Sequence, residues 1–242
     1  MKLPITNLHG EMLDLAFHPG EKTDRLVVLG HGVTGNKDRP LLIALAEGLN
    51  ARGWSCLRIS YSGNGASQGR FEESTITKEI ADLQSVFDAI SESTRIAYCG
   101  HSMGGAVGVL TAVRDERLRV LITLAGMVFT RDFCQREFGE LTPDQDFMWD
   151  EKTCPLSSAY VDDLHTHEST LDAARAMEVP WLLIHGTADD VVFPADSEAA
   201  HAVAPEPKKL VCINDAGHSF DETSYPKIID EIDAWLRLHL TI

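Results

Sequence analysis

A serine that lies between glycines is the first candidate for a chemically active residue in this sequence. The segment Gly100-His101-Ser102-Met103-Gly104-Gly105 follows an apolar run, residues 95–99, and precedes a run of small residues, 106–113. This order predicts a strand, an abrupt turn and a helix, the setting of the Gly-x-Ser-x-Gly nucleophile elbow. Such a turn pushes the hydroxyl out at the end of the strand, beside the positive amino end of the helix. The motif alone also fits a glycine-rich turn that exists only for packing.

A serine hydroxyl is a poor nucleophile unless a base lies beside it, and the base needs an acid that orients it. Two further segments supply candidates. The apolar run 181–184 is followed by His185-Gly186-Thr187-Ala188-Asp189-Asp190, and the run 210–213 leads to Gly217-His218-Ser219-Phe220. Serine, acid and histidine then follow in the chain order of α/β hydrolases, each after a strand. Three such matches in this order predict a catalytic triad.

The sequence resembles an α/β hydrolase of the serine esterase type, and within that group the small bacterial cinnamoyl/feruloyl esterase-like hydrolases. The segment His31–Lys37 resembles the oxyanion loop of that family, and residues 63–69 with Phe71-Glu72 resemble its next loop. His185-Gly186-x-x-Asp189 and Gly217–Phe220 resemble the acid and base loops. The resemblance covers nearly the whole chain. Related lipases and peptidases share most of these motifs.

The resemblance implies a role for each of three side chains. Ser102 attacks a carbonyl carbon, His218 takes the serine proton and then gives it to the leaving group, and Asp189 orients the imidazole. The backbone N–H groups of Val33 and Met103 are the expected oxyanion hole. No cofactor and no metal is expected.

Asp190 competes with Asp189 for the role of the acid. The family pattern places the acid at the fifth position of His-Gly-x-x-Asp, which is Asp189. Asp215 and Asp221 flank the histidine and are predicted to be solvated loop residues. The chain departs from the family at Val33, where many esterases of this group carry an aromatic residue, and this difference predicts an altered pocket.

Other histidines have structural interpretations. His31 and His185 lie in His-Gly turns and are predicted to stabilise loops through hydrogen bonds, and His101 is predicted to be structural and not basic. His165 and His167 lie near several acids and could bind a metal, but a solvated surface is the preferred interpretation. The acids are Asp162, Asp163 and Glu168.

Composition excludes several classes of partner. The 242 residues carry a formal net charge of -16 and have a sequence pI near 4.9. This argues against nucleic acid and anionic membranes as partners, and mildly against strongly anionic substrates. The start of the chain lacks a secretory pattern, and no apolar run could span a bilayer. Five cysteines match no zinc pattern, and pairing of Cys134 with Cys154 is a minor alternative to a reducing, cytoplasmic setting.

Apolar strand-like runs alternate with helical patterns along most of the chain, and these runs are apolar throughout. Both features predict an α/β-hydrolase fold, a mostly parallel central sheet with helices on both faces. A hairpin formed by residues 3–8 and 12–18 is expected before this sheet. We expect residues 1–242 to form a single domain.

The alternation breaks from about residue 127 to residue 177. This segment contains no obvious strand, and a structureless loop of this length would be unusual, so short helices are expected. We interpret it as a cap inserted into the domain. Its aromatic residues are either the core of the cap or the lining of an acyl pocket, and the candidate substrate-binding residues are Phe129, Phe133, Phe147 and Trp149.

These observations predict a serine carboxylester hydrolase that acts on short-acyl or aromatic, hydroxycinnamoyl-type esters. A thioesterase, a monoacylglycerol lipase and an aminopeptidase-like enzyme could use the same triad. The acid-rich cap leaves an aminopeptidase as an alternative, because such an enzyme needs carboxylates to bind the free amine of its substrate. A non-catalytic ligand-binding protein with this fold is less favoured. The expected partner is a small-molecule ester, with no nucleic acid and no membrane, and the oligomeric state, a homodimer included, stays open.

Overall fold

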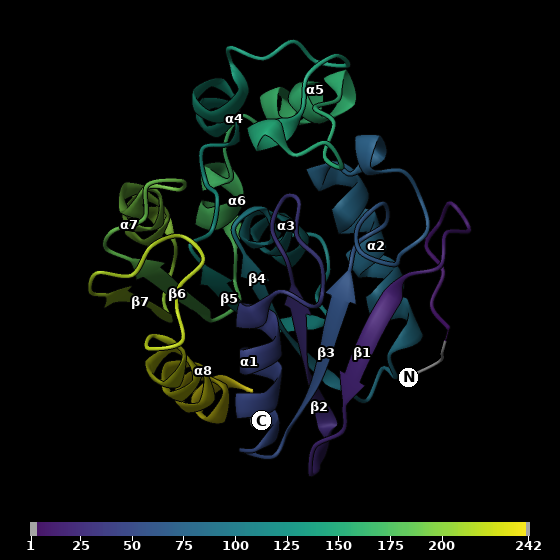
Figure 1. Cartoon of the computed structure of the whole chain (residues 1–242). Coiled ribbons are helices and arrows are strands. Elements are labelled where there is room, and N and C mark those ends of the chain that lie inside the picture. The colour runs from purple at the N-terminus through teal and green to yellow at the C-terminus, as the bar shows by residue number, and fades with distance from the viewer. Residues whose placement is uncertain (1–3, 241–242) are drawn as a thin grey trace.

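The computed structural model describes residues 4–240, and its strands form one seven-stranded sheet (Figure 1). The strand order is β1-β3-β2-β4-β5-β6-β7. β1 runs antiparallel to β3, and all other neighbours are parallel. The predicted fold class is confirmed. The strands are β1 (Asp14–His18), β2 (Lys22–Gly30), β3 (Trp54–Ser60), β4 (Arg95–His101), β5 (Leu118–Leu124), β6 (Trp181–Gly186) and β7 (Lys208–Ile213).

Helices cover both faces of this sheet. α1 (Pro40–Asn50) and α8 (Tyr225–His239) pack side by side on one face (Figure 1). α2 (Ile76–Ala89), α3 (Met103–Ala112) and α7 (Pro194–Val203) lie on the other. Alternate strand residues enter the two cores: Val27 and Leu29 face α1 and α8, and Val28 faces α2 and α3. Burial of both faces explains why the strands read as continuous apolar runs.

The predicted opening hairpin forms around Gly10 between residues 5–7 and 11–13, but it is shorter than predicted, and β1 continues beyond it into the sheet. β1 pairs with β3, with Asp14 opposite Ser60 and His18 opposite Cys56. Before β1, the described residues make one isolated bridge, between Thr6 and Met12. Leu3, the start of the expected first strand, lies outside the described residues. The edge of the sheet at β3 therefore receives the second half of the expected hairpin alone.

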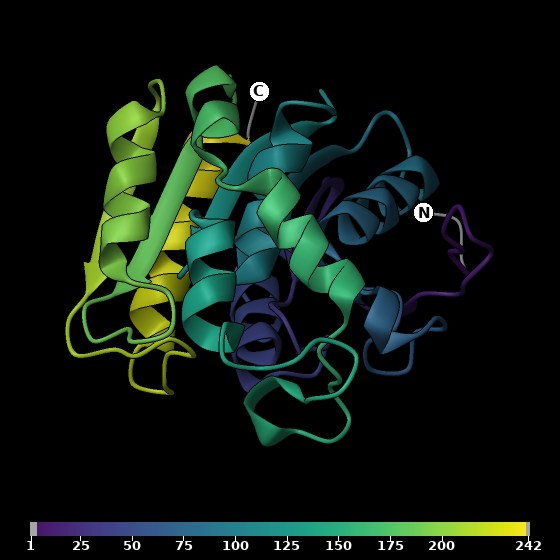
Figure 2. The same ribbon diagram turned by 90° about the horizontal axis from the view of Figure 1, so that it is seen from above.

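Residues 127–177, which we call the cap segment, leave the sheet after β5 and return at β6. They form α4 (Thr130–Phe138), the 3-10 turn η2 (Met148–Asp150), α5 (Ser158–His167) and α6 (Leu171–Ala176). Seen from above, the segment lies between α7 and α2 (Figure 2). Its side chains Phe133, Tyr160 and Leu164 join the same apolar cluster as α2 and α3, so the segment shares the main core. Another 3-10 turn, η1 (Phe71–Glu73), precedes α2.

None of the helices in residues 4–240 has the length and apolar character needed to cross a membrane.

Candidate active site

Ser102 lies at the junction of β4 and α3 with φ 56 and ψ -121, a backbone conformation that residues with a side chain rarely adopt. The glycines around it allow close packing of the chain. A Cβ on Gly100 would lie 2.2 Å from the carbonyl oxygen of Gly104, and a Cβ on Gly104 would lie 2.5 Å from the carbonyl oxygen of His31. The Ser102 N–H donates to Leu124 O at 3.0 Å, which ties the turn to β5. The sequence around the serine thus folds into the sharp strand-to-helix turn that its spacing predicts.

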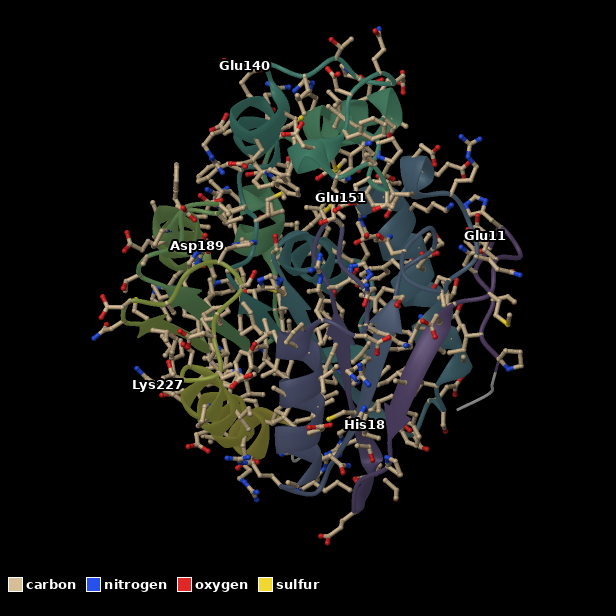
Figure 3. All side chains as sticks on the ribbon, viewed as in Figure 1. Glu11, His18, Glu140, Glu151, Asp189 and Lys227 are labelled. Atoms are coloured by element: carbon tan, nitrogen blue, oxygen red, sulfur yellow. The ribbon has the colours of Figure 1, made fainter. Side chains whose placement is uncertain are left out.

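His218 and Asp189 lie in the loops that follow β7 and β6, and Figure 3 shows Asp189 below α7. The Nδ1 atom of His218 lies 2.9 Å from Oδ2 of Asp189. His218 and Ser102 line the same cavity. Within residues 4–240, Ser102 Oγ makes no hydrogen bond, so its hydroxyl is free to turn toward the imidazole or a ligand.

Four groups surround the carboxylate of Asp189, whose side chain is fully buried. Oδ1 accepts the backbone N–H groups of Val191 and Val192, each at 3.0 Å, and Oδ2 lies 3.1 Å from Nε2 of His185 as well as near His218. Burial alone would raise the pKa of Asp189, but the hydrogen bonds from both histidines and from Val191 hold that pKa well below its ordinary value. The carboxylate is therefore ionised. Its neighbour in sequence, Asp190, is exposed, and the structure brings only Asp189 to His218.

Two more histidines stiffen the loops around the serine. His31 accepts the N–H of Tyr61 on Nε2 at 3.1 Å, so its Nδ1–H donates to Gly32 O at 2.8 Å, and burial lowers its pKa to about 4. His101 donates from Nε2 to the carbonyl oxygen of His218 at 2.9 Å, and burial, followed by the charge of His218, lowers the pKa of His101 to about 3. Both are neutral near pH 7 and make hydrogen bonds that hold loops in place.

The loop after β2 lies directly against the serine. A Cβ on Gly32 would lie 2.6 Å from Ser102 Cβ and 3.1 Å from its Oγ, so only glycine allows this approach. Val33 is the next residue and lines the cavity, and Met103 begins α3. Neither N–H group donates to an acceptor in the part of the chain that the structure describes. Val33 follows Gly32, which packs against Ser102, and Met103 follows Ser102 itself, so both donors are close to the serine in sequence.

A cavity of about 580 Å³ opens over these groups. Of the four aromatic residues predicted to bind substrate, Trp149 lines it, with φ 48, and Phe129, Phe133 and Phe147 do not. Phe133 is 2% exposed and packs edge-on against Phe138 at 5.9 Å, because its position on α4 points into the core of the cap segment. Residues outside the cap segment form much of the wall instead, and the sequence analysis did not predict them. They are Arg39, Pro40, Leu41, Leu42, Phe220 and Tyr225.

A signal for some of the missed residues exists in the sequence. Phe220 follows the predicted base by two positions, and Leu41 and Leu42 open the helix that comes after the oxyanion loop. Their apolar spacing predicts a helix core, and they serve that core as well as the cavity wall. Composition gives no way to tell these two environments apart.

Side chains near His165 contact helix α2. No group of three or more metal-ligating side chains comes together among residues 4–240. His167 and Asp163 instead meet Thr77 of α2, whose hydroxyl donates to Asp163 at 2.5 Å and lies 3.1 Å from the His167 ring. All five cysteines are free, Cys134 and Cys154 included.

A mostly parallel sheet with a serine elbow, followed by an acid loop and a histidine loop, defines an α/β hydrolase. Residues 21–149, more than half of the chain, match the family model described as serine aminopeptidase, S33, and the protein belongs to this family. The expected resemblance to α/β-hydrolase serine esterases is confirmed.

Individual relatives agree with this assignment. The chain is 27% identical over 225 residues to the uncharacterized protein YfhR of Salmonella typhi, covering 88% of this chain and 70% of YfhR. It is 26% identical over 164 residues to the human mitochondrial palmitoyl-protein thioesterase ABHD10, covering 62% of this chain and 52% of ABHD10. Among solved structures, Est1E from Butyrivibrio proteoclasticus with ferulic acid bound superposes with a TM-score of 0.87 at 25% identity, covering 98% of this chain and 99% of Est1E.

Proposed function

We propose that this protein is a serine carboxylester hydrolase that works through an acyl-enzyme. One observation carries the proposal: Ser102, on its strained turn, lines the same cavity as His218, and His218 contacts Asp189. An ionised carboxylate on Nδ1 keeps that proton in place and leaves Nε2 of His218 as the basic atom.

The reaction follows from these positions. Ser102 Oγ attacks the ester carbonyl carbon while His218 Nε2 takes the hydroxyl proton, and the carbonyl oxygen gains negative charge. The N–H groups of Val33 and Met103 bind that oxygen, a contact worth about 2.7–4 kcal/mol for one donor in related sites. His218 then protonates the leaving alcohol. Water, deprotonated by the same nitrogen, attacks the acyl carbon and releases the acid and Ser102.

The cavity wall favours an ester over a peptide with a free amino terminus. An aminopeptidase needs carboxylates at the point where the amine binds, and none of the described residues lining the cavity carries one. Trp149, Phe220 and Tyr225 present aromatic surface to a volume that lies in the usual range for small-molecule sites. The Est1E structure, which holds ferulic acid, supports an aromatic or short acyl group.

A thioester is the second candidate bond, and it rests on the relative named palmitoyl-protein thioesterase ABHD10. The same serine, base and oxyanion donors would serve, because both reactions pass through a tetrahedral oxyanion. A panel with p-nitrophenyl acetate, p-nitrophenyl dodecanoate, methyl ferulate and palmitoyl-coenzyme A separates these substrates. We expect the acetate or the ferulate to give the highest kcat/KM, whereas preference for palmitoyl-coenzyme A would make the thioesterase the better assignment.

The nucleophile is tested by Ser102→Ala. Because triad members act as a unit, turnover of the best substrate should fall by about 10⁴- to 10⁶-fold. Ser93→Ala, at an exposed serine distant from this cavity, is the matched control and should retain wild-type rates. Substantial activity in a folded Ser102→Ala protein would assign the nucleophile elsewhere.

A further inference from the structure

The charge of the cavity wall is opposite to that of the molecule. The chain carries 37 acidic and 21 basic residues, yet the described residues that line the cavity include one arginine, Arg39, and no carboxylate. Asp189 lies behind His218 with a fully buried side chain. The other side chains of the wall that could carry charge are histidines, and His31 and His101 are neutral.

Arg39 differs from its neighbours in lacking an acidic partner. Lys37 pairs with Asp38 at 2.6 Å and with Asp14 at 3.2 Å, and Arg58 pairs with Asp38 at 2.9 Å. Arg39 forms no ion pair with any residue in the 4–240 range, and its one side-chain hydrogen bond runs from Nη2 to Thr34 O at 2.9 Å. A guanidinium has five N–H donors in a planar fork, so most of them remain available to a ligand.

Glu137, an acid of the cap segment that contacts the wall residue Trp149, is engaged by other groups. Glu137 accepts the indole N–H of Trp149 at 3.1 Å and pairs with Arg136 at 3.1 Å. Glu140 lies at the far tip of the cap segment, well away from Asp189 (Figure 3). The acid-rich composition of the cap segment thus does not place a carboxylate in the wall.

The backbone holds Arg39 at this place. Pro40 restricts the residue before it to an extended conformation, and Arg39 has φ -60 and ψ 137. Its carbonyl accepts the N–H of Ile43 at 3.1 Å, which fixes it to the start of α1. The first turn of α1 carries no acidic residue and no side-chain cap, so no negative group of that turn offsets the guanidinium. The charge of Arg39 acts on the site, since it contributes to lowering the pKa of His31 and of His101.

We propose that Arg39 binds an anionic group of the substrate, and that the enzyme prefers esters with an apolar or aromatic body and a carboxylate or other anion away from the scissile bond. This proposal rests on the proposed function and names the substrate class of the same site. The net charge of -16 opposes an anion only weakly at physiological salt, because charges beyond about 8 Å are screened, whereas the guanidinium acts at contact.

Calorimetric titration with a matched pair of ligands tests the proposal without depending on catalysis. The ligands are 3-phenylpropionate and its neutral isostere 3-phenylpropanamide, and the proteins are wild type, Arg39→Gln and Arg70→Gln. Arg70 is an exposed arginine in another loop, so its variant matches the change in net charge. In wild type the carboxylate should bind about five- to tenfold more tightly than the amide, as expected for one charge-assisted contact at a half-open site. The preference should vanish in Arg39→Gln and persist in Arg70→Gln.

Three results would overturn the role of Arg39: equal binding of both ligands by wild type, no carboxylate binding at millimolar concentration, or a preference that survives Arg39→Gln. Hydrolysis of neutral p-nitrophenyl acetate by wild type reports on the proposed function separately. An active esterase without a carboxylate preference refutes the substrate class alone, and an inactive protein with the preference refutes the esterase alone.

A kinetic comparison extends the test to substrates. The p-nitrophenyl half-ester of adipic acid and p-nitrophenyl 6-methylheptanoate differ by a carboxylate in place of an isopropyl group. Arg39→Gln should lower the ratio of their kcat/KM values about five- to tenfold relative to wild type, and Arg39→Glu should lower it further. A ratio unchanged in both variants contradicts selection by Arg39.

Discussion

Two segments hold the carboxylate of Asp189 in place: strand β6 and the loop that follows it. His185 contacts it from β6 and is itself held by Ser197 at 2.7 Å and by Val192 O at 2.9 Å. Val191 and Val192 donate to Oδ1 from the loop after β6, which also holds Asp189. Only Oδ2 contacts His218, so the orientation of the His218 ring depends on this network.

The adjacent acids give the first prediction. Asp189→Asn should lower kcat about 10⁴-fold, because the amide N–H favours the wrong imidazole tautomer. Asp190→Asn is the matched control at an exposed position and should lose about tenfold or less. Steady-state kinetics on p-nitrophenyl acetate, with folding followed by circular dichroism, measures both. The reverse ranking would give the acid role to Asp190.

Another buried acid, Glu79, has no ion-pair partner among the described residues. Glu79 of α2 is 1% exposed, Oε1 accepts the hydroxyl of Ser74 at 3.2 Å, and Oε2 has no partner among the described residues. Burial, and then the charge of Asp82, raises the pKa of Glu79 well above its ordinary value. Folding therefore keeps a proton on Glu79 at a pH where the unfolded chain releases it.

Stability should fall with rising pH on account of this group. The contribution of Glu79 is complete below about pH 4.3, its unfolded pKa, and is lost as the pH rises toward the raised folded pKa, by at most about 1.4 kcal/mol per pH unit. Glu79→Gln keeps the acceptor for Ser74 and removes the titration. The difference in Tm, variant minus wild type, should grow between pH 5 and pH 8. A difference that stays constant over this range would mean that Glu79 does not titrate there.

At the scale of elements, helix α4 reaches the acid loop. Arg136 of α4 donates from Nη2 to the carbonyl of Val191 and lies over the ring of Phe193, 4.3 Å from its centroid. Val191 is the residue that donates to Asp189 and also lines the cavity. The cap segment thus contacts the loop that positions the acid.

Arg136→Gln should loosen that loop. Loss of one charge-assisted hydrogen bond at a partly exposed site costs about 1 kcal/mol, which predicts about a fivefold fall in kcat/KM. Arg131→Gln is the control on the same helix, where Arg131 pairs with Glu168 and not with the acid loop. The values of kcat/KM for both variants on p-nitrophenyl acetate test this prediction. If kcat/KM falls equally in both, α4 acts only through the overall stability of the protein.

At the scale of the whole molecule, charge repulsion opposes the compact state. The net charge of -16 is spread over a surface of 10444 Å². Exposed ion pairs, such as that between Arg175 and Asp172, contribute little to the free energy of unfolding. The repulsion acts over long distances, so it depends on the salt concentration.

Sodium chloride should therefore stabilise the protein. Raising ionic strength from about 0.01 M to about 0.15 M shortens the Debye length from about 30 Å to about 8 Å. For a domain of this size, each 1 kcal/mol gained raises Tm by about 2–4 °C. Thermal melts at both concentrations measure the shift, and a lower Tm at the higher salt would mean that attractive ion pairs outweigh the repulsion.

The sequence by itself determined the features that depend on neighbouring residues. Glycines spaced around Ser102 allow one sharp turn, continuous apolar runs require a sheet buried on both faces, and the chain order of the three loops brings them to one edge of a parallel sheet. The acid pattern also separated Asp189 from Asp190, since a position in a short turn sets which side chain points inward.

Only the tertiary structure decided what depends on contacts between distant segments. It placed Trp149 in the cavity and Phe133 in the core, paired β1 with β3, and left Arg39 in the wall without the acidic partner that its neighbours Lys37 and Arg58 have. Each outcome depends on which side chains meet across the fold. Composition records how many aromatic and acidic residues a segment holds, but burial and charge pairing are set by the segments that pack against it.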